Sequence, residues 1–130
     1  MKHIEDSHQE QLFNWARTKG FVLPGRGLVK LIDYMYAIPN GGKRGKLEAA
    51  RLKKQGVKAG VSDIHLTLPY NGFYGLWIEL KRPIVKGKPK PSVSPSQKEW
   101  IQRMNENGHL AIVAYGYKEA RAGIESYFTN

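Results

Sequence analysis

The stretch VSDIHLTLPYNGFYGLWIELKR, residues 61–82, decides the fold of this chain. Apolar and polar residues alternate in its first half (61–68) and again in its last third (75–82), which is the period of a β-strand with one buried face. The Asn71-Gly72 pair between them is typical of a tight turn. We therefore expect two adjacent antiparallel strands that form a hairpin.

The alternation separates an apolar face of the hairpin from a polar one. Ile64 and Leu66 belong to the apolar face of the first strand, and Ile78 and Leu80 to that of the second. Pairing the strands with these faces aligned brings together the polar residues of the opposite face. These polar residues are Asp63, His65, Glu79 and Lys81, and an even-sum register sets Asp63 opposite either Glu79 or Lys81.

Two carboxylates and an ammonium group on one small face make a candidate active site. Carboxylates repel one another unless a cation lies between them. Mg²⁺ binds one or two carboxylates together with water and phosphate oxygens, and a metal-bound water has a lowered pKa. An ammonium group offsets the charge that grows on a phosphorus oxygen. Asp63, Glu79 and Lys81 therefore predict phosphodiester hydrolysis, whereas Glu79 and Lys81 alone would be an ordinary solvated strand face.

Hydrophobic periodicity and breaker residues predict the elements around the hairpin. Helices are expected at residues 5–19, 43–55, 94–107 and 118–128, and further strands at 32–38 and 109–115. A segment with two glycines and one proline spans residues 22–27, and residues 83–93 are expected to form a mobile basic loop. Trp77 lies on the polar face of the hairpin, where we expect it to pack under the first helix. We expect His65 to pack or to form hydrogen bonds rather than to act in catalysis.

The size and charge of the chain limit the possible functions. Its 130 residues fit a single domain, and the absence of cysteine excludes disulfides and thiolate metal sites. A net charge of +10 favours a polyanionic partner, above all nucleic acid. No apolar run approaches the roughly 18 residues of a membrane span, and the polar N-terminus does not resemble a signal peptide, so we expect a cytoplasmic protein. The candidate phosphate contacts are Lys43, Arg44, Lys46, Lys58, Lys86, Lys88 and Lys90.

Several motifs, taken in order along the chain, resemble the VRR-NUC family of the PD-(D/E)xK, or restriction-endonuclease-like, nucleases, in particular its standalone phage-type members. One departure is Ser62, where the family usually has proline before the motif aspartate; proline restricts the backbone and supplies no chemistry. The matching pieces are Glu10, Pro39-Asn40-Gly41-Gly42, the segment 56–63 that ends in Asp63, Trp77-Ile78-Glu79-Leu80-Lys81, and Ser94-Pro95-Ser96-Gln97.

The resemblance implies an α/β fold with an αβββαβ core, in which helices flank a central mixed sheet of about four strands. It also implies a site for Mg²⁺ or Mn²⁺ held by Asp63, Glu79 and the Leu80 backbone carbonyl. Lys81 would be the catalytic lysine and Gln97 would orient the nucleophile or this lysine. Glu10 would be a further metal ligand, either through water or at a second metal.

The function that the resemblance implies is that of a DNA endonuclease, acting as a homodimer on branched DNA such as four-way junctions. Two-fold symmetry would then present two active sites to two strands. Two alternatives remain open at this point. One alternative to the DNA endonuclease is a non-cleaving DNA-binding module of the same fold. The other is a nuclease directed at RNA, since charge does not distinguish DNA from RNA.

Overall fold

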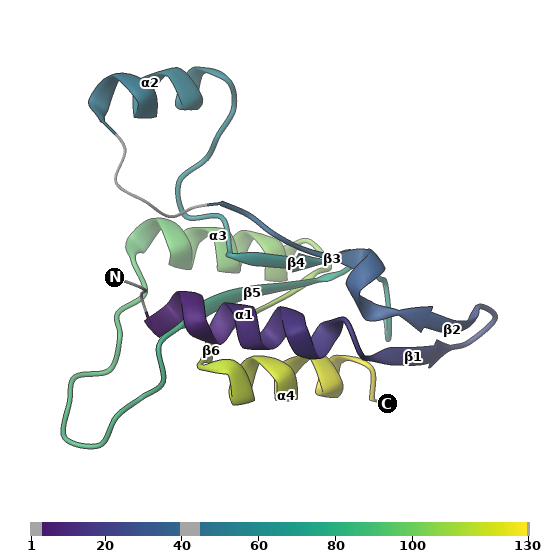
Figure 1. Cartoon of the computed structure of the whole chain (residues 1–130). Coiled ribbons are helices and arrows are strands. Elements are labelled where there is room, and N and C mark those ends of the chain that lie inside the picture. The colour runs from purple at the N-terminus through teal and green to yellow at the C-terminus, as the bar shows by residue number, and fades with distance from the viewer. Residues whose placement is uncertain (1–3, 40–44, 130) are drawn as a thin grey trace.

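The computed structural model describes residues 4–39 and 45–129 (Figure 1). Lys43 and Arg44, two of the predicted phosphate contacts, lie outside these ranges. None of the helices in the described ranges is long and apolar enough to cross a membrane. In chain order the elements are α1 (Ile4–Ala16), β1 (Gly20–Leu23), β2 (Gly27–Lys30), the 3-10 helix η1 (Leu31–Tyr34), β3 (Met35–Ala37), α2 (Lys46–Lys54), β4 (Ile64–Leu66), β5 (Leu76–Lys81), α3 (Pro95–Glu106), β6 (Leu110–Tyr115) and α4 (Tyr117–Tyr127).

A mixed sheet in the order β3-β4-β5-β6 forms the centre of the fold. β3, β4 and β5 pair antiparallel, while β5 and β6 pair parallel. A parallel pair needs a crossover connection, and α3 supplies it. Helix α1, the three strands β3 to β5, α3 and β6 make up the expected αβββαβ core. α2 is inserted between β3 and β4, and α4 follows the core.

The two faces of the sheet have different coverings. α1 and α4 pack against each other and against the apolar face, where Leu12, Ile78, Leu80 and Ile124 are buried. α3 covers β5 and β6 on the opposite side, which is the polar face of the hairpin (Figure 1). The polar residues of β5 therefore lie between the sheet and α3.

The predicted hairpin is confirmed, and its register resolves one open alternative. Ile64 pairs with Ile78, so continuing the same register by one residue sets Asp63 opposite Glu79. The Asn71-Gly72 turn is closed by reciprocal backbone hydrogen bonds between Tyr70 and Phe73. Both turn residues have positive φ, 51° and 87°, which asparagine and glycine adopt at low cost.

One hairpin was not predicted, and one predicted strand was wrong. Around residues 22–27, β1 and β2 form a separate antiparallel hairpin. Its turn depends on positive φ at Gly25 and Gly27, and its strands of four residues are too short for a clear alternation. Residues 32–38 are not one strand, because η1 occupies 31–34 and only Met35–Ala37 pairs with β4. β4 spans only Ile64–Leu66, and one backbone hydrogen bond on either side of it, Ile38 N–H to the Asp63 carbonyl and Thr67 N–H to the Tyr34 carbonyl, continues the contact with this segment.

Candidate active site

Asp63 lies just before β4 and is connected to both neighbouring strands. Its carbonyl oxygen accepts a hydrogen bond from the Ile38 backbone N–H at 2.7 Å, which ties it to the end of β3. Its carboxylate oxygen Oδ2 accepts a hydrogen bond from the Leu80 backbone N–H at 2.8 Å. The Asp63 carboxylate is therefore oriented toward β5, beside Glu79.

Glu79 is a buried acid in the middle of the sheet, with 2% of its surface exposed. Its Oε2 accepts a hydrogen bond from Gln97 Nε2 at 3.2 Å and lies 3.8 Å from Lys81 Nζ. The other oxygen, Oε1, is buried and has no hydrogen-bond partner within the described ranges. Half of this carboxylate is thus bound by the protein, and the other half remains available to a ligand.

The surroundings of Glu79 favour its protonated form. Burial raises the pKa of Glu79 to about 9, and the negative charge of Asp63 contributes in the same direction. Lys81 lowers this pKa, and Glu5 adds a smaller contribution that raises it. Without a cation, Glu79 is therefore protonated near neutral pH.

Gln97 is held in place by the first turn of α3. The backbone N–H of Gln97 donates to Ser94 Oγ at 3.2 Å, and its Oε1 accepts from the Ser94 backbone N–H at 2.8 Å, which together form a capping box. The same Oε1 also accepts from Lys81 Nζ at 3.0 Å. The cap therefore fixes the amide that links Lys81 to Glu79.

The oxygen donors of this site fit a hard divalent cation. A buried carboxylate oxygen without a partner, next to a second carboxylate, is the environment that Mg²⁺ or Mn²⁺ would neutralise. No group of three His, Cys, Asp or Glu residues that could hold a metal occurs in residues 4–39 and 45–129. Two carboxylates, with water and phosphate oxygens completing the coordination, nevertheless match the usual Mg²⁺ site.

The sequence profile of the VRR-NUC domain family matches residues 5–118. The chain belongs to the VRR-NUC domain family. It is also similar to a solved structure described as a VRR_NUC domain protein, with 31% sequence identity and a TM-score of 0.76 over 98% of this chain and 89% of that one. Among curated proteins, none matches the chain. Family and fold together show that this is a nuclease fold.

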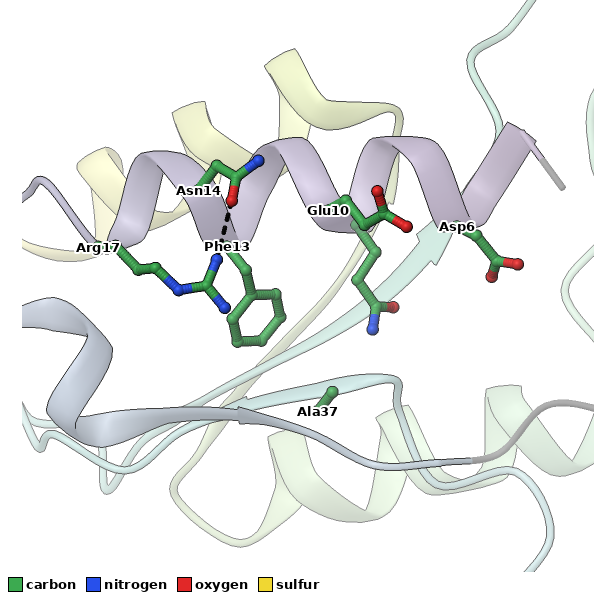
Figure 2. A pocket seen from close by; sticks show the side chains of 7 residues that line it. Asp6, Glu10, Phe13, Asn14, Arg17 and Ala37 are labelled. Atoms are coloured by element: carbon green, nitrogen blue, oxygen red, sulfur yellow. Dashed lines mark hydrogen bonds between the residues drawn. The ribbon is translucent and has the colours of Figure 1, made fainter. Parts of the chain in front are cut away.

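In this VRR-NUC domain, Glu10 lines a cavity beside α1. It lies on the exposed side of α1 and lines a cavity of about 700 Å³ between α1 and Ala37 of β3 (Figure 2). Asp6 and the hydrogen-bonded pair of Asn14 and Arg17 line the same cavity. The predicted role of Glu10 as a further metal ligand remains a prediction.

Glu5 is the acid of α1 that the sequence analysis missed. Its charge raises the pKa of Glu79. The sequence signal that could have identified Glu5 is its spacing from two other residues of α1. Glu5 stands three residues before His8 and seven before the fully buried Leu12, which places these residues on one stripe of the helix.

His65 and Trp77 form an aromatic cluster beside the carboxylates. Their rings stack at 3.8 Å with an interplanar angle of 8°, and His65 Nδ1 is hydrogen-bonded to the Tyr36 hydroxyl at 2.7 Å. This confirms the expected packing role of His65. Trp77, however, makes an edge contact with Trp100 of α3, so packing under the first helix was wrong. The reason is that α1 lies on the opposite face of the sheet.

The described basic residues of the prediction lie on exposed segments around the site. Lys46 belongs to α2 and Lys58 to the connection that returns from α2 to β4. The loop that carries Lys86, Lys88 and Lys90 begins just after Lys81 and ends at the cap of α3 (Figure 1), so both of its ends meet the site. Lys90 Nζ lies 4.7 Å above the Tyr115 ring.

Proposed function

We propose that this VRR-NUC domain is a metal-dependent DNA endonuclease that hydrolyses phosphodiester bonds. The observation that carries the proposal is the buried Glu79 beside Asp63: its Oε1 has no hydrogen-bond partner within the described ranges, and its other oxygen lies 3.8 Å from Lys81 Nζ. A structural ion pair would give both oxygens of Glu79 partners, because an unpartnered buried carboxylate oxygen costs free energy. Retaining such an oxygen favours a ligand-binding role.

The proposed mechanism assigns a task to each residue of the site. Asp63, Glu79 and the Leu80 carbonyl would hold Mg²⁺ or Mn²⁺, which supplies Lewis-acid polarisation of the phosphate and an acidified water when bound. Lys81 orients the attacking water and offsets the charge that develops on the phosphate oxygens. Gln97 keeps the Lys81 ammonium and the Glu79 carboxylate at a fixed separation through its two hydrogen bonds.

The proposed substrate is DNA, and the proposed assembly is a homodimer that acts on branched DNA such as four-way junctions. The net charge of +10 favours a polyanion, and two-fold symmetry would match the two strands cut at a junction. Glu10 would join through water or at a second metal. Sedimentation of the protein with and without a four-way junction tests the assembly independently of cleavage.

Cleavage of a substrate panel tests the activity. Wild-type protein should cut at least one of a duplex, a flap, a nicked duplex and a four-way junction with Mn²⁺, and EDTA should stop it. Asp63→Ala and Lys81→Ala should abolish cleavage while binding persists. Lys98→Ala, on the exposed side of α3, is the matched lysine control and should cut normally. Binding without any cleavage would favour the DNA-binding module, and cleavage of RNA alone would favour the RNA nuclease.

A further inference from the structure

Helix α2 stands away from the body of the domain. It has no buried residue, and Figure 1 shows it raised beside the sheet on the α3 side. The chain returns from it through residues 55–63 to Asp63 and β4. We call α2 and this return the α2 arm.

The α2 arm touches the body at the start of α3. Gly60 has a φ of +87°, and a Cβ at this position would overlap the Ser96 carbonyl group. Only glycine permits this approach, because it tolerates positive φ and has no side chain. The return segment is therefore pressed against the helical turn that carries Gln97.

A groove of about 620 Å³ lies between the α2 arm and the first turn of α3. The groove reaches the active site, because Gln97 lines it and also bonds to Glu79 and Lys81. Its arm side includes Leu52, Lys53 and Lys58, and its α3 side includes Ser94, Ser96 and Gln97.

The lining of this groove suits a nucleic acid strand. Lys53, Lys58 and the serine hydroxyl groups can bind phosphates, while Leu52 offers an apolar surface to sugars and bases. A second cavity of about 470 Å³ adjoins the groove along the return segment and is mainly apolar, with Ile38 and Trp100 in its wall. Residues 45–61 carry five basic side chains against the single acid Glu48, so the arm is complementary to a polyanion.

The size of the groove distinguishes a single strand from a duplex. A volume of about 620 Å³ falls in the roughly 300–1,000 Å³ range of sites for small ligands. Such a space holds one or two nucleotides and does not admit a double helix. Proteins that bind single strands combine a positive groove with apolar or aromatic surfaces for the bases, and both are present here.

We infer that the groove between the α2 arm and α3 binds an unpaired stretch of the DNA strand that the site cuts. This inference rests on the proposed function for the position of the scissile phosphate beside Glu79. It makes unpaired nucleotides at a branch point, rather than duplex sequence, the feature that the enzyme recognises.

The test compares two double variants in EDTA, where binding is measured without cleavage. Lys53→Gln/Lys58→Gln removes the two lysines of the groove, and Lys54→Gln/Lys98→Gln removes the same charge from positions that do not line it. The probe is a fluorescein-labelled 12-nucleotide single strand, with the corresponding duplex as a second probe. Each lost phosphate contact lowers the salt slope of single-strand binding by about 0.7, so the groove variant should lose about 1.4 in slope. At 0.1 M NaCl this corresponds to a roughly 25-fold weaker affinity.

Each outcome either supports or overturns the inference. A large loss for the single strand, a much smaller one for the duplex and little effect of the control variant would support it. Equal losses for both probes, or equal losses for both variants, would show general phosphate attraction and overturn it. The proposed function is judged separately, by cleavage with Mn²⁺. A protein that binds single strands through Lys53 and Lys58 but never cuts would retain the groove and lose the nuclease assignment.

Discussion

Metal binding to this domain should release a proton, and the size of the effect follows from the carboxylate pair. With the pKa of Glu79 raised to about 9, Glu79 carries a proton in most metal-free molecules at pH 7. A divalent cation requires both carboxylates to be ionised, so binding must expel this proton. Close to one proton should be released for each metal bound.

The release of this proton also determines how the affinity for the metal changes with pH. Below the raised pKa, the apparent association constant should rise about tenfold per pH unit, or about 100-fold between pH 6 and pH 8. The folding stability of the metal-free protein changes with pH in the opposite direction to the metal affinity. Because the folded pKa lies above the ordinary value of 4.5, the folded state binds the proton more tightly and stability falls as pH rises from about 4.5 to 9.

Titration calorimetry with Mn²⁺ in two buffers of different ionisation enthalpy measures the released proton directly. The observed heats should differ by the difference in buffer enthalpy multiplied by about one proton. Glu79→Gln is the control, because it cannot carry the proton and should leave any residual binding insensitive to pH. Heats that agree in both buffers, together with a flat affinity from pH 6 to 8, would refute the assignment of a proton to Glu79 in the metal-free protein.

Three further predictions concern stability and positioning. Ser94→Ala removes the cap of α3 and should lower the free energy of unfolding in urea by about 1 kcal/mol. It should also lower kcat more than it changes KM, because Gln97 loses its support. An unchanged kcat would show that the cap does not position the active site. The pKa of His65 is lowered to about 4 by burial and by His109, so it contributes stability above pH 6.5 that is lost as pH falls toward 4. Between pH 7.5 and 4.5, the free energy of unfolding of His65→Gln should fall by about 1–2 kcal/mol less than that of the wild type. This value is discounted for solvent screening because the ring is only partly buried. An equal fall in both proteins would exclude this role of His65. Ser62 is fully buried, and its Oγ has no hydrogen-bond partner in the part of the chain described. Ser62→Ala should therefore raise the free energy of unfolding by about 1 kcal/mol. A lower free energy of unfolding than that of the wild type would show that the hydroxyl group forms a stabilising hydrogen bond.

Local alternation was enough to predict the centre of the site. The period of two in the hairpin placed Asp63, Glu79 and Lys81 on one face, because the direction of a strand side chain depends only on its position in the strand. Gln97 was identified from the family resemblance. Its hydrogen bonds to Glu79 and Lys81 depend on the crossover that brings α3 over β5.

Other features depend on contacts between segments that are distant in the sequence, and local sequence patterns do not predict them. The burial of Glu79 results from α3 covering the polar face, so an alternating pattern suggested a more exposed residue. The β1–β2 hairpin and η1 are too short for periodicity to specify. The groove beside Gln97 exists because Gly60 meets Ser96 across 36 positions of sequence.

The side-chain amide of Gln97 both caps α3 and binds Glu79 and Lys81, and this restricts which residue can occupy position 97. Capping boxes elsewhere accept glutamate as readily as glutamine at the third helical position. Here a glutamate would still cap the Ser94 N–H and attract Lys81, but it would point a negative oxygen at Glu79 in place of an N–H donor. A substitution that is conservative for the helix would therefore add a third acid to a buried pair, and selection for folding and selection for chemistry converge on one side chain.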